Sequence, residues 1–549
     1  MGKISAPEDM IETPPENKNN NKNQVVKNAF AMSMGTFSSR ILGLLRDTLL
    51  MSFFPRPITD AWTAAFRLPN ILRRLLGEGS LSVSFIPVFV DCLESSKHGA
   101  SPAKAQNFLN SLYTLLLIIL TGLTALGVLY SDQVMRWVLD ESYIQNVENF
   151  SIAVRMSQIM FGFIFLMSQY ALFMGVLNSL GSFAWPAMAP LFFNISMIIS
   201  TVLPDAWFSF PGEGLAWGVL IGGIFQMGVL IPPLVRRGYL PKLTMRLWTP
   251  EVKMVLSRMV PGLFGMGVLQ LSLVINQRFA SSLGDGPISY IYIADRLLEL
   301  PLSLVSVSLG TALLPSLATL LAEGKRKEML QTAEYYFRLN LYVVLAAATG
   351  LYFLGGAIVE LFFQRGQFTA SDTASTAQVI QIWALIMIPA SAVRILAPSY
   401  YAVKNTWYPA VISLISLIGH FFLAPVLMEK WGLRGLNYSS LASSSFNFLA
   451  LFLAFPVFIG SFSVGKFIVP LIKYVFICAL MGLVLQIHPL LKPVLVDHWH
   501  FAGQAVTLFF CIGLAGVIFI LASRGLQLEE YEGTFAKVIR KITRKLGFK

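Results

Sequence analysis

The stretch that decides the fold runs from Ser38 to Phe89 and reads SSRILGLLRDTLLMSFFPRPITDAWTAAFRLPNILRRLLGEGSLSVSFIPVF. Its hydropathy predicts two membrane-spanning helices joined by a short turn. The same stretch carries many ionisable side chains, among them Arg40, Arg46, Asp47, Asp60, Arg67, Arg73, Arg74 and Glu78. An ionisable group at bilayer depth costs on the order of 2.5 kcal/mol or more, so it normally faces a polar cavity or a partner. We therefore expect these charges to serve function.

The composition predicts an all-α polytopic membrane protein. Of 549 residues, 55% are hydrophobic and only 13% are charged, and the mean hydropathy is +0.65. A soluble domain has about 25% charged residues. The net charge of +12 does not indicate a nucleic-acid partner, because the surplus lies in loops and tail, where it fits cytoplasmic segments facing anionic lipid.

Fourteen apolar runs predict about 14 transmembrane helices. They fall at 27–54, 60–92, 104–130, 150–179, 184–203, 214–235, 252–283, 287–321, 331–358, 373–403, 408–428, 435–459, 466–488 and 501–523. With an even number of spans both termini lie on one side. The loops and tails on that side hold 22 Lys and Arg against 6 in the opposite loops, so we expect both termini to be cytoplasmic.

The two ends of the chain are predicted to lie outside the spans. Residues 1–24 are polar and rich in Asn and Lys, without the apolar core of a signal peptide, and are predicted to be a disordered cytoplasmic tail. Residues 526–549 place apolar side chains at helical spacing among lysines and arginines. They are predicted to form a basic amphipathic helix on anionic headgroups; a solvated basic tail is the alternative.

An internal repeat divides the spans. AFRLPN at 65–70 resembles ADRLLELP at 294–301, with arginines 229 residues apart, and FAWPA at 183–187 resembles TWYPA at 406–410, with prolines 223 apart. These offsets predict two pseudo-repeated six-helix lobes at 25–237 and 238–461, and repeats of this kind are typical of transporters. Spans thirteen and fourteen, at 462–525, have no counterpart and are an appendage.

The charges of the two lobes form matching patterns. Asp60, Arg67 and Arg74 are seven residues apart, so they share one face of a helix. The second lobe repeats the theme with Asp295, Arg296 and Glu299. If the two walls face each other, they enclose a cationic central cavity. Guanidinium groups bind phosphate in a bidentate way, so a pyrophosphate is a fitting guest.

A structural interpretation of the same charges stays open. The arginines could form ion pairs near the membrane interface, or extend toward it as long cationic side chains do. We interpret Asp47, Asp60, Glu78, Asp295 and Glu299 as orienting or gating carboxylates rather than substrate ligands. His420 is predicted to be a buried polar contact, with a proton relay as the alternative, and Asn276 and Gln277 to form interhelical hydrogen bonds.

Motifs of enzymes and metal sites are missing from the sequence. It contains no Walker A motif, no HExxH and no paired aspartates of the kind that hold a metal in membrane transferases. Cys92, Cys478 and Cys511 lie far apart and form no CxxC. We therefore expect no catalytic residues, no metal and no cofactor. Without a nucleotide site, the membrane potential or an ion gradient is the expected source of energy.

Several motifs together resemble the MurJ/MviN family of the multidrug/oligosaccharidyl-lipid/polysaccharide exporter superfamily. They are SSRILGLLRD (38–47), TDAWTAAFRLPNILRRLLGEGSLSVSFIPVF (59–89), YIADRLLELP (292–301), LGTALLPSL (309–317) and LFFQRGQFT (361–369). The resemblance covers the first ten spans. Spans eleven to fourteen match only in hydropathy and order.

The resemblance implies a flippase of the bacterial inner membrane that moves lipid II, undecaprenyl-pyrophosphoryl disaccharide-pentapeptide, to the periplasmic leaflet by alternating access. It implies headgroup ligands at Arg40, Arg46, Arg73, Arg296 and Ser289, and functional acidic positions at Asp60, Glu78 and Glu299. Where many relatives have lysine, this chain has Arg67. Spans thirteen and fourteen would line a groove for the lipid tail. We expect a monomer, with cell-wall synthesis proteins and anionic lipids as partners.

Two alternatives remain. Another exporter of the superfamily, for polysaccharide-lipid or drugs, would share the fold, although a drug exporter favours acidic and aromatic cavity residues. A membrane-embedded enzyme that processes lipid is the second alternative.

Overall fold

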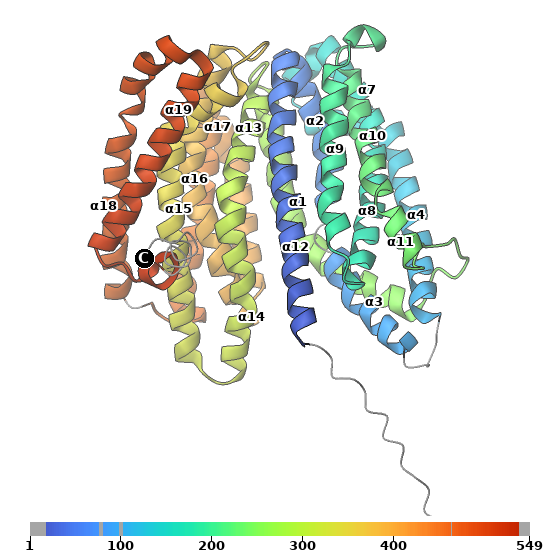
Figure 1. Cartoon of the computed structure of the whole chain (residues 1–549). Coiled ribbons are helices and arrows are strands. Elements are labelled where there is room, and N and C mark those ends of the chain that lie inside the picture. Colours follow the sequence, from blue (N-terminus) through green and yellow to red (C-terminus); the bar gives the residue numbers. More distant parts are fainter. Residues whose placement is uncertain (1–17, 76–80, 98–102, 463, 537–549) are drawn as a thin grey trace, which may run out of the picture.

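The computed structural model describes residues 18–75, 81–97, 103–462 and 464–536. Within these ranges the chain is helical and has no strand, which confirms the predicted all-α class. In Figure 1 the helices gather into two bodies that stand side by side, with α1 near the boundary between them.

The first body, here called the N-lobe, contains the helices up to residue 236. They are α1 (Lys18–Phe53), α2 (Arg56–Arg73), α3 (Ser82–Lys97), α4 (Lys104–Leu129), α5 (Ser131–Val138), α6 (Glu141–Gln145), α7 (Val147–Met160), α8 (Gly162–Ser179), α9 (Ala184–Val202), α10 (Glu213–Gly228) and α11 (Ile231–Arg236). Proline sets the start of α2, because Pro55 has an extended backbone and Pro57 occupies the first turn, where a missing N–H costs nothing.

The second body, the C-lobe, follows in the chain. Its helices are α12 (Pro250–Ser281), α13 (Pro287–Pro301), the π-helical segment η3 (Leu302–Val307), α14 (Ser308–Ala322), α15 (Arg326–Phe363), α16 (Ala370–Ala402) and α17 (Trp407–Phe458). The hairpin α18 (Val464–Leu485) and α19 (His488–Gly525) packs on α15 at the outer edge of this body (Figure 1). We call the end of the bundle that carries the α1–α2 turn the turn end, and the opposite end the tail end.

Ten helical segments are long and apolar enough to cross a membrane by length and composition. All fourteen predicted runs fall on helices, but α1, the α2–α3 pair and α12 are not among these ten segments. The eleventh and twelfth runs are counted once, since α17 joins them across a kink. The kink is at Gly432, whose φ of 52° is a left-handed value that glycine adopts without strain.

One boundary differs from prediction. The second run falls on α2 and α3, and residues 76–80 between these helices lie outside the described residues. Lys18–Gln24 are helical, so the first helix begins inside the segment that we predicted to be disordered. Residues 1–17 and most of the predicted amphipathic tail, 537–549, lie outside the described residues.

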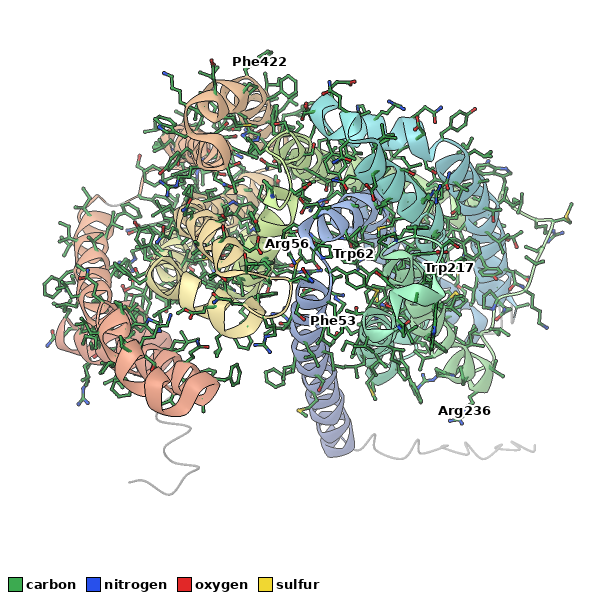
Figure 2. The ribbon with its side chains drawn as sticks, turned by 90° about the horizontal axis from the view of Figure 1, so that it is seen from above. Phe53, Arg56, Trp62, Trp217, Arg236 and Phe422 are labelled. Carbon is green, nitrogen blue, oxygen red and sulfur yellow. The ribbon has the colours of Figure 1, made fainter. Side chains whose placement is uncertain are left out.

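Large apolar side chains cover the perimeter. Phe422, Leu453 and Val457 are 69%, 72% and 79% exposed, and Figure 2 places Phe422 at the outer edge of the bundle while Trp62 lies inside. A water-facing surface rarely carries so many exposed apolar side chains, whereas the bilayer solvates them. The perimeter therefore fits contact with lipid.

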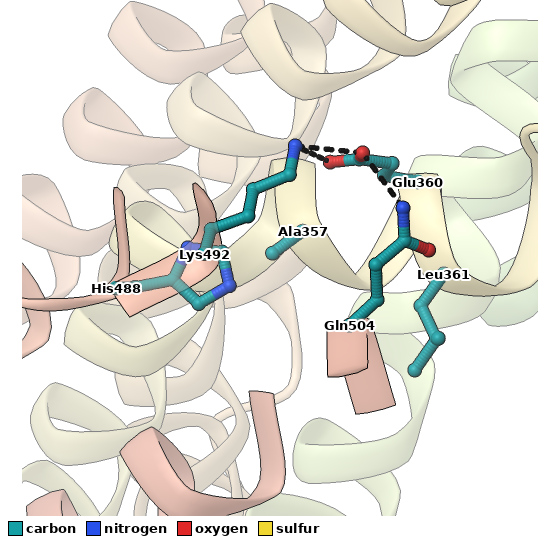
Figure 3. A pocket seen from close by; sticks show the side chains of 6 residues that line it. All are labelled: Ala357, Glu360, Leu361, His488, Lys492 and Gln504. Atoms are coloured by element: carbon teal, nitrogen blue, oxygen red, sulfur yellow. Dashed lines mark hydrogen bonds and ion pairs between the residues drawn. The ribbon is translucent and has the colours of Figure 1, made fainter. Parts of the chain in front are cut away.

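Ionic contacts fix the hairpin to α15 near both of its ends. The Nζ of Lys492 lies 2.7 Å from both carboxylate oxygens of Glu360, and Gln504 donates to the same carboxylate, beside a small pocket (Figure 3). Near the tail end, Arg338 of α15 pairs with Glu529 at 2.6 Å. The hairpin is thus held as an extension of the C-lobe.

Candidate functional site

A charged cluster from both lobes surrounds the hydroxyl of Tyr292 on α13. This hydroxyl donates to Asp47 on α1 at 2.9 Å and accepts from Arg296 at 3.1 Å and from Arg46 at 3.4 Å. Arg46 also donates to Asp47 twice, and Arg296 lies 3.6 Å from the second carboxylate oxygen of Asp47. The side-chain oxygen of Asn194 on α9 accepts another hydrogen bond from the Arg46 guanidinium at 3.1 Å. We call Arg46, Asp47, Tyr292 and Arg296 the central cluster.

Further charges extend the cluster toward the tail end. Arg74 and Arg296 each lie 3.6 Å from a carboxylate oxygen of Glu299. Arg67 donates to Gln277 of α12 at 2.8 Å and interacts electrostatically with Asp295 and with Arg296. The arginines therefore outnumber the carboxylates in this region, and helices of both lobes contribute these arginines.

Part of this region is open to solvent. The side chains of Arg74, Arg296 and Glu299 are 28%, 31% and 47% exposed. Arg40, nearer the tail end on α1, is exposed and donates to Ser303 of η3. The guanidinium of Arg74 forms an ion pair with Glu299 at 3.6 Å but no hydrogen bond to it, so within the part of the chain that the structure describes its N–H groups remain available. A solvated anion that approaches from the tail end could accept hydrogen bonds from them.

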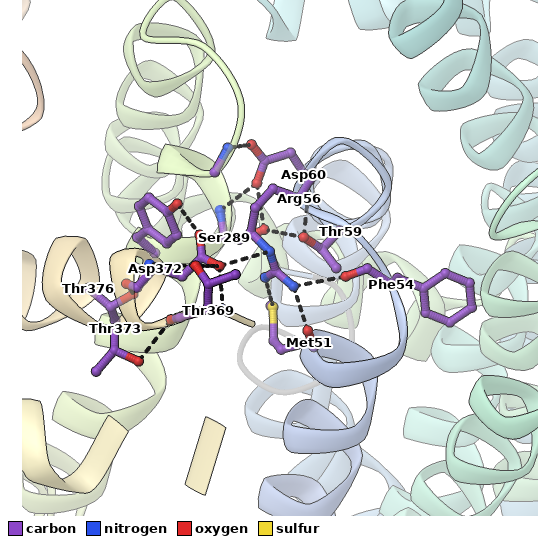
Figure 4. Close-up of polar contacts among 12 residues, drawn as sticks. Met51, Phe54, Arg56, Thr59, Asp60, Ser289, Thr369, Asp372, Thr373 and Thr376 are labelled. Carbon is purple, nitrogen blue, oxygen red and sulfur yellow. Dashed lines mark hydrogen bonds and ion pairs between the residues drawn. The ribbon is translucent and has the colours of Figure 1, made fainter. Parts of the chain in front are cut away.

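The turn end of the same interface is sealed. Asp60 of α2 is fully buried and accepts from the backbone N–H of Gly286 at 2.6 Å and of Ser289 at 2.8 Å, and from the Ser289 hydroxyl (Figure 4). These N–H groups belong to the start of α13, whose first turn has no partners within its own helix. A carboxylate of one lobe thus caps a helix of the other.

A second contact at the turn end, the Arg56 latch, fastens the α15–α16 loop to the α1–α2 turn (Figure 4). The buried Arg56 guanidinium donates to two backbone carbonyls of that turn, lies 3.9 Å from Asp372 and stands over the ring of Phe368. Gln367 donates its N–H to the carbonyl of Ser52 at 2.8 Å. Only glycine fits at 366, because a Cβ there would lie 2.2 Å from the Ser52 oxygen.

The structure separates the predicted site residues into two groups. Arg46, Arg67, Arg74, Arg296, Asp47, Asp295 and Glu299 lie together between the lobes. Asp60 lies in the seal although it shares a helix face with Arg67, and Ser289 lies there too. Ser289 is fully buried and donates to Asp60 in this conformation, and its role as a headgroup ligand stays a prediction.

Other predicted residues lie beside or beyond these groups. Arg73 donates to Asn70 on its own helix. Glu78 lies outside the described residues. Sequence reasoning missed Tyr292, which gives no charge signal, and Arg394 on α16, which interacts electrostatically with Glu299 and Asp295. It also did not single out Arg56.

A family model described as lipid II flippase MurJ matches residues 49–500. A probable lipid II flippase MurJ of Bdellovibrio bacteriovorus is 47% identical over 470 residues, which are 86% of this chain and 89% of that protein. The chain belongs to the MurJ lipid II flippase family. The lipid II flippase MurJ of Burkholderia cenocepacia is 33% identical over 423 residues, 76% of this chain and 81% of its own.

Solved structures share the fold. A lipid II flippase MurJ in an inward closed conformation matches with a TM-score of 0.71 at 24% identity, over 90% of this chain and 99% of that one. An inward-facing multidrug transporter of the MATE family matches with a TM-score of 0.61 at 15% identity, over 75% of this chain and 93% of that one. This MurJ-family chain is therefore a multi-pass membrane protein of a transport family.

Proposed function

We propose that this MurJ-family protein is a lipid II flippase of the bacterial inner membrane. The central cluster is the observation that carries the proposal, because it places guanidinium groups of both lobes around one point inside a membrane protein. A pyrophosphate and its sugars cannot cross hydrocarbon unaided. Arginines that stay charged at any physiological pH can hold the diphosphate while the polyprenyl tail remains in lipid.

The orientation follows from the distribution of charge along the chain. The tail end carries the lysine- and arginine-rich loops and is assigned to the cytoplasm, with both termini. The turn end is then periplasmic, and the seal of Asp60 and Ser289 closes it. In this state the arginines accept a headgroup from the cytoplasmic leaflet.

Transport then requires the two lobes to exchange contacts. Breaking the seal and the Arg56 latch frees the periplasmic end, while the lobes close at the cytoplasmic end. Tyr292 takes part in both states of the cluster, since its hydroxyl can turn from Asp47 to a phosphate oxygen. No nucleotide supplies the energy in this scheme. The membrane potential or an ion gradient resets the lobes.

The hairpin and the partners complete the proposal. The apolar α18–α19 hairpin, fixed to α15 by Lys492 and Glu360, offers a surface for the polyprenyl tail. The protein works as a monomer on anionic lipid, beside proteins of cell-wall synthesis that use the exported precursor.

Depletion with complementation tests this function. Cells lacking the native flippase would carry the wild-type chain, Arg296→Ala, or Arg236→Ala as a matched control, since Arg236 is exposed at the perimeter (Figure 2). With equal amounts of protein in the membrane, lipid II should reach the outer leaflet with wild type and Arg236→Ala but not with Arg296→Ala. Normal exposure of lipid II with Arg296→Ala would contradict the proposal.

A further inference from the structure

A buried histidine joins three helical segments of the C-lobe away from the central cluster. His420, in the first half of α17, is 3% exposed. Its Nε2 lies 3.0 Å from Oδ1 of Asn276 on α12, and its Nδ1 lies 2.9 Å from Oγ of Ser439 in the second half of α17. Of the five histidines of the chain, it alone falls in an apolar run of the two lobes.

The hydrogen bonds around His420 suit either protonation state. Asn276 Oδ1 is an acceptor and also receives the Ser440 hydroxyl, so Nε2 carries a proton and donates. In the neutral ring, Nδ1 accepts from the Ser439 hydroxyl. When Nδ1 takes a proton, it donates to Ser439 Oγ, whose own hydrogen turns to the carbonyl oxygen of His420, 3.3 Å away. A proton is therefore accepted with every hydrogen bond kept.

The surroundings of His420 contain no counter-charge among the described residues. Asn276 and the ring of Phe279 face it from α12, and Ser439 and Ser440 face it from the second half of α17. Arg278, the nearest charge along α12, donates to carbonyls of the N-lobe instead. A protonated ring in this setting costs free energy as long as it stays buried. Protonation therefore favours a conformation in which the site is hydrated.

α12 connects this site to the central region. The residue after Asn276 is Gln277, which accepts from Arg67 at 2.8 Å and faces the carbonyl of Ala64 on α2. Two neighbouring residues of one helix thus hold the histidine of the C-lobe on one side and an arginine of the N-lobe on the other. A shift of α12 at Asn276 moves the partner of Arg67.

We propose that His420 is a proton-binding residue that controls the balance between the two lobe arrangements through Asn276 and Gln277 of α12. The reaction is the addition of one proton from water to Nδ1 and its later release, with no other bond changed. The inference rests on the proposed function only in taking the lobes to alternate. Protonation should shift the protein away from the state with a sealed turn end.

Spin-label distances test this without lipid II. Labels at Trp207→Cys and Leu490→Cys, which are 71% and 72% exposed, report on the two lobes at the turn end in a background free of the native cysteines. Lowering the pH from about 8 to about 5.5, the range in which histidine titrates, should lengthen the distance. The ratio of open to sealed protein should rise by about tenfold, a usual size for such coupling.

Three variants test whether the pH response of the distance depends on His420 and on its link to Arg67. His420→Gln keeps a donor for Asn276 and an acceptor for Ser439, so it should fold and lose the pH response. His488→Gln, a matched control beside the pocket of Figure 3, should keep it. Gln277→Leu should reduce it, because the link to Arg67 is cut. A distance that does not change with pH in the wild type, or a full pH response in His420→Gln, would overturn the proposal. A pH-dependent distance in a protein that does not transport lipid II would instead contradict the flippase assignment.

Discussion

The seal at Asp60 allows a prediction with a calculable size. The carboxylate accepts three hydrogen bonds from the start of α13. Asn in its place keeps the shape but has one acceptor, and its amide group then points at a backbone N–H. Hydrogen bonds to a charged group contribute about 1.5–3 kcal/mol each. Losing one and setting two donors face to face should cost the sealed state about 2–3 kcal/mol.

That cost sets the expected change in conformation. Since about 1.4 kcal/mol is a factor of ten, Asp60→Asn should lower the ratio of sealed to open protein about 30- to 150-fold. The open state loses little, because water solvates either side chain there. The whole effect therefore appears in the balance between the two arrangements.

Cysteine labelling in cells measures this balance. Thr63 is 3% exposed, close to Asp60 on α2, so Thr63→Cys should react with an external membrane-impermeant maleimide only when the turn end opens. Asp60→Asn should raise the labelling rate by the factor above. Asp132→Asn, which removes an exposed carboxylate paired with Arg136, is the control and should leave the rate unchanged. An unchanged rate in Asp60→Asn would refute the assignment of the seal.

Three further predictions concern single contacts. Arg56→Gln should leave Asp372 without its cation and destabilise the sealed state by about 3 kcal/mol, so that Thr63→Cys is labelled faster. An unchanged labelling rate would show that the Arg56 latch does not hold the turn end closed. Tyr292→Phe removes the hydroxyl that joins the arginines and should weaken lipid II binding about tenfold in a vesicle titration. Glu360→Gln breaks a partly exposed pair worth about 1 kcal/mol, so the Tm should fall by only about 2 °C and transport should persist.

Much of the fold could be predicted from hydropathy, because spans must satisfy their own backbone. The order of the helices and the existence of an appended hairpin followed from the length and spacing of apolar runs. The extent of α2 did not, since Pro69 lies inside this helix, which continues to Arg73. Prolines and glycines predict a distortion but not its place.

The site was partly visible in the sequence for a related reason. Charges in apolar runs stand out, so Arg46, Asp47 and Arg296 could be singled out before their contacts were known. Tyr292 could not, because a tyrosine in a span is more often an ordinary interior residue. The split between seal and cluster also needed coordinates: Asp60 and Arg67 share a face, yet two turns of α2 carry them to different depths.

The most direct test of the central claim compares two lipids in vesicles that contain the purified protein. One is lipid II, and the other has the same tail and sugars but a neutral linker in place of the pyrophosphate. The wild type should translocate lipid II much faster than the neutral lipid, and Arg296→Ala should abolish that difference. Equal rates for both lipids in the wild type would contradict recognition of the diphosphate by the arginines of the two lobes.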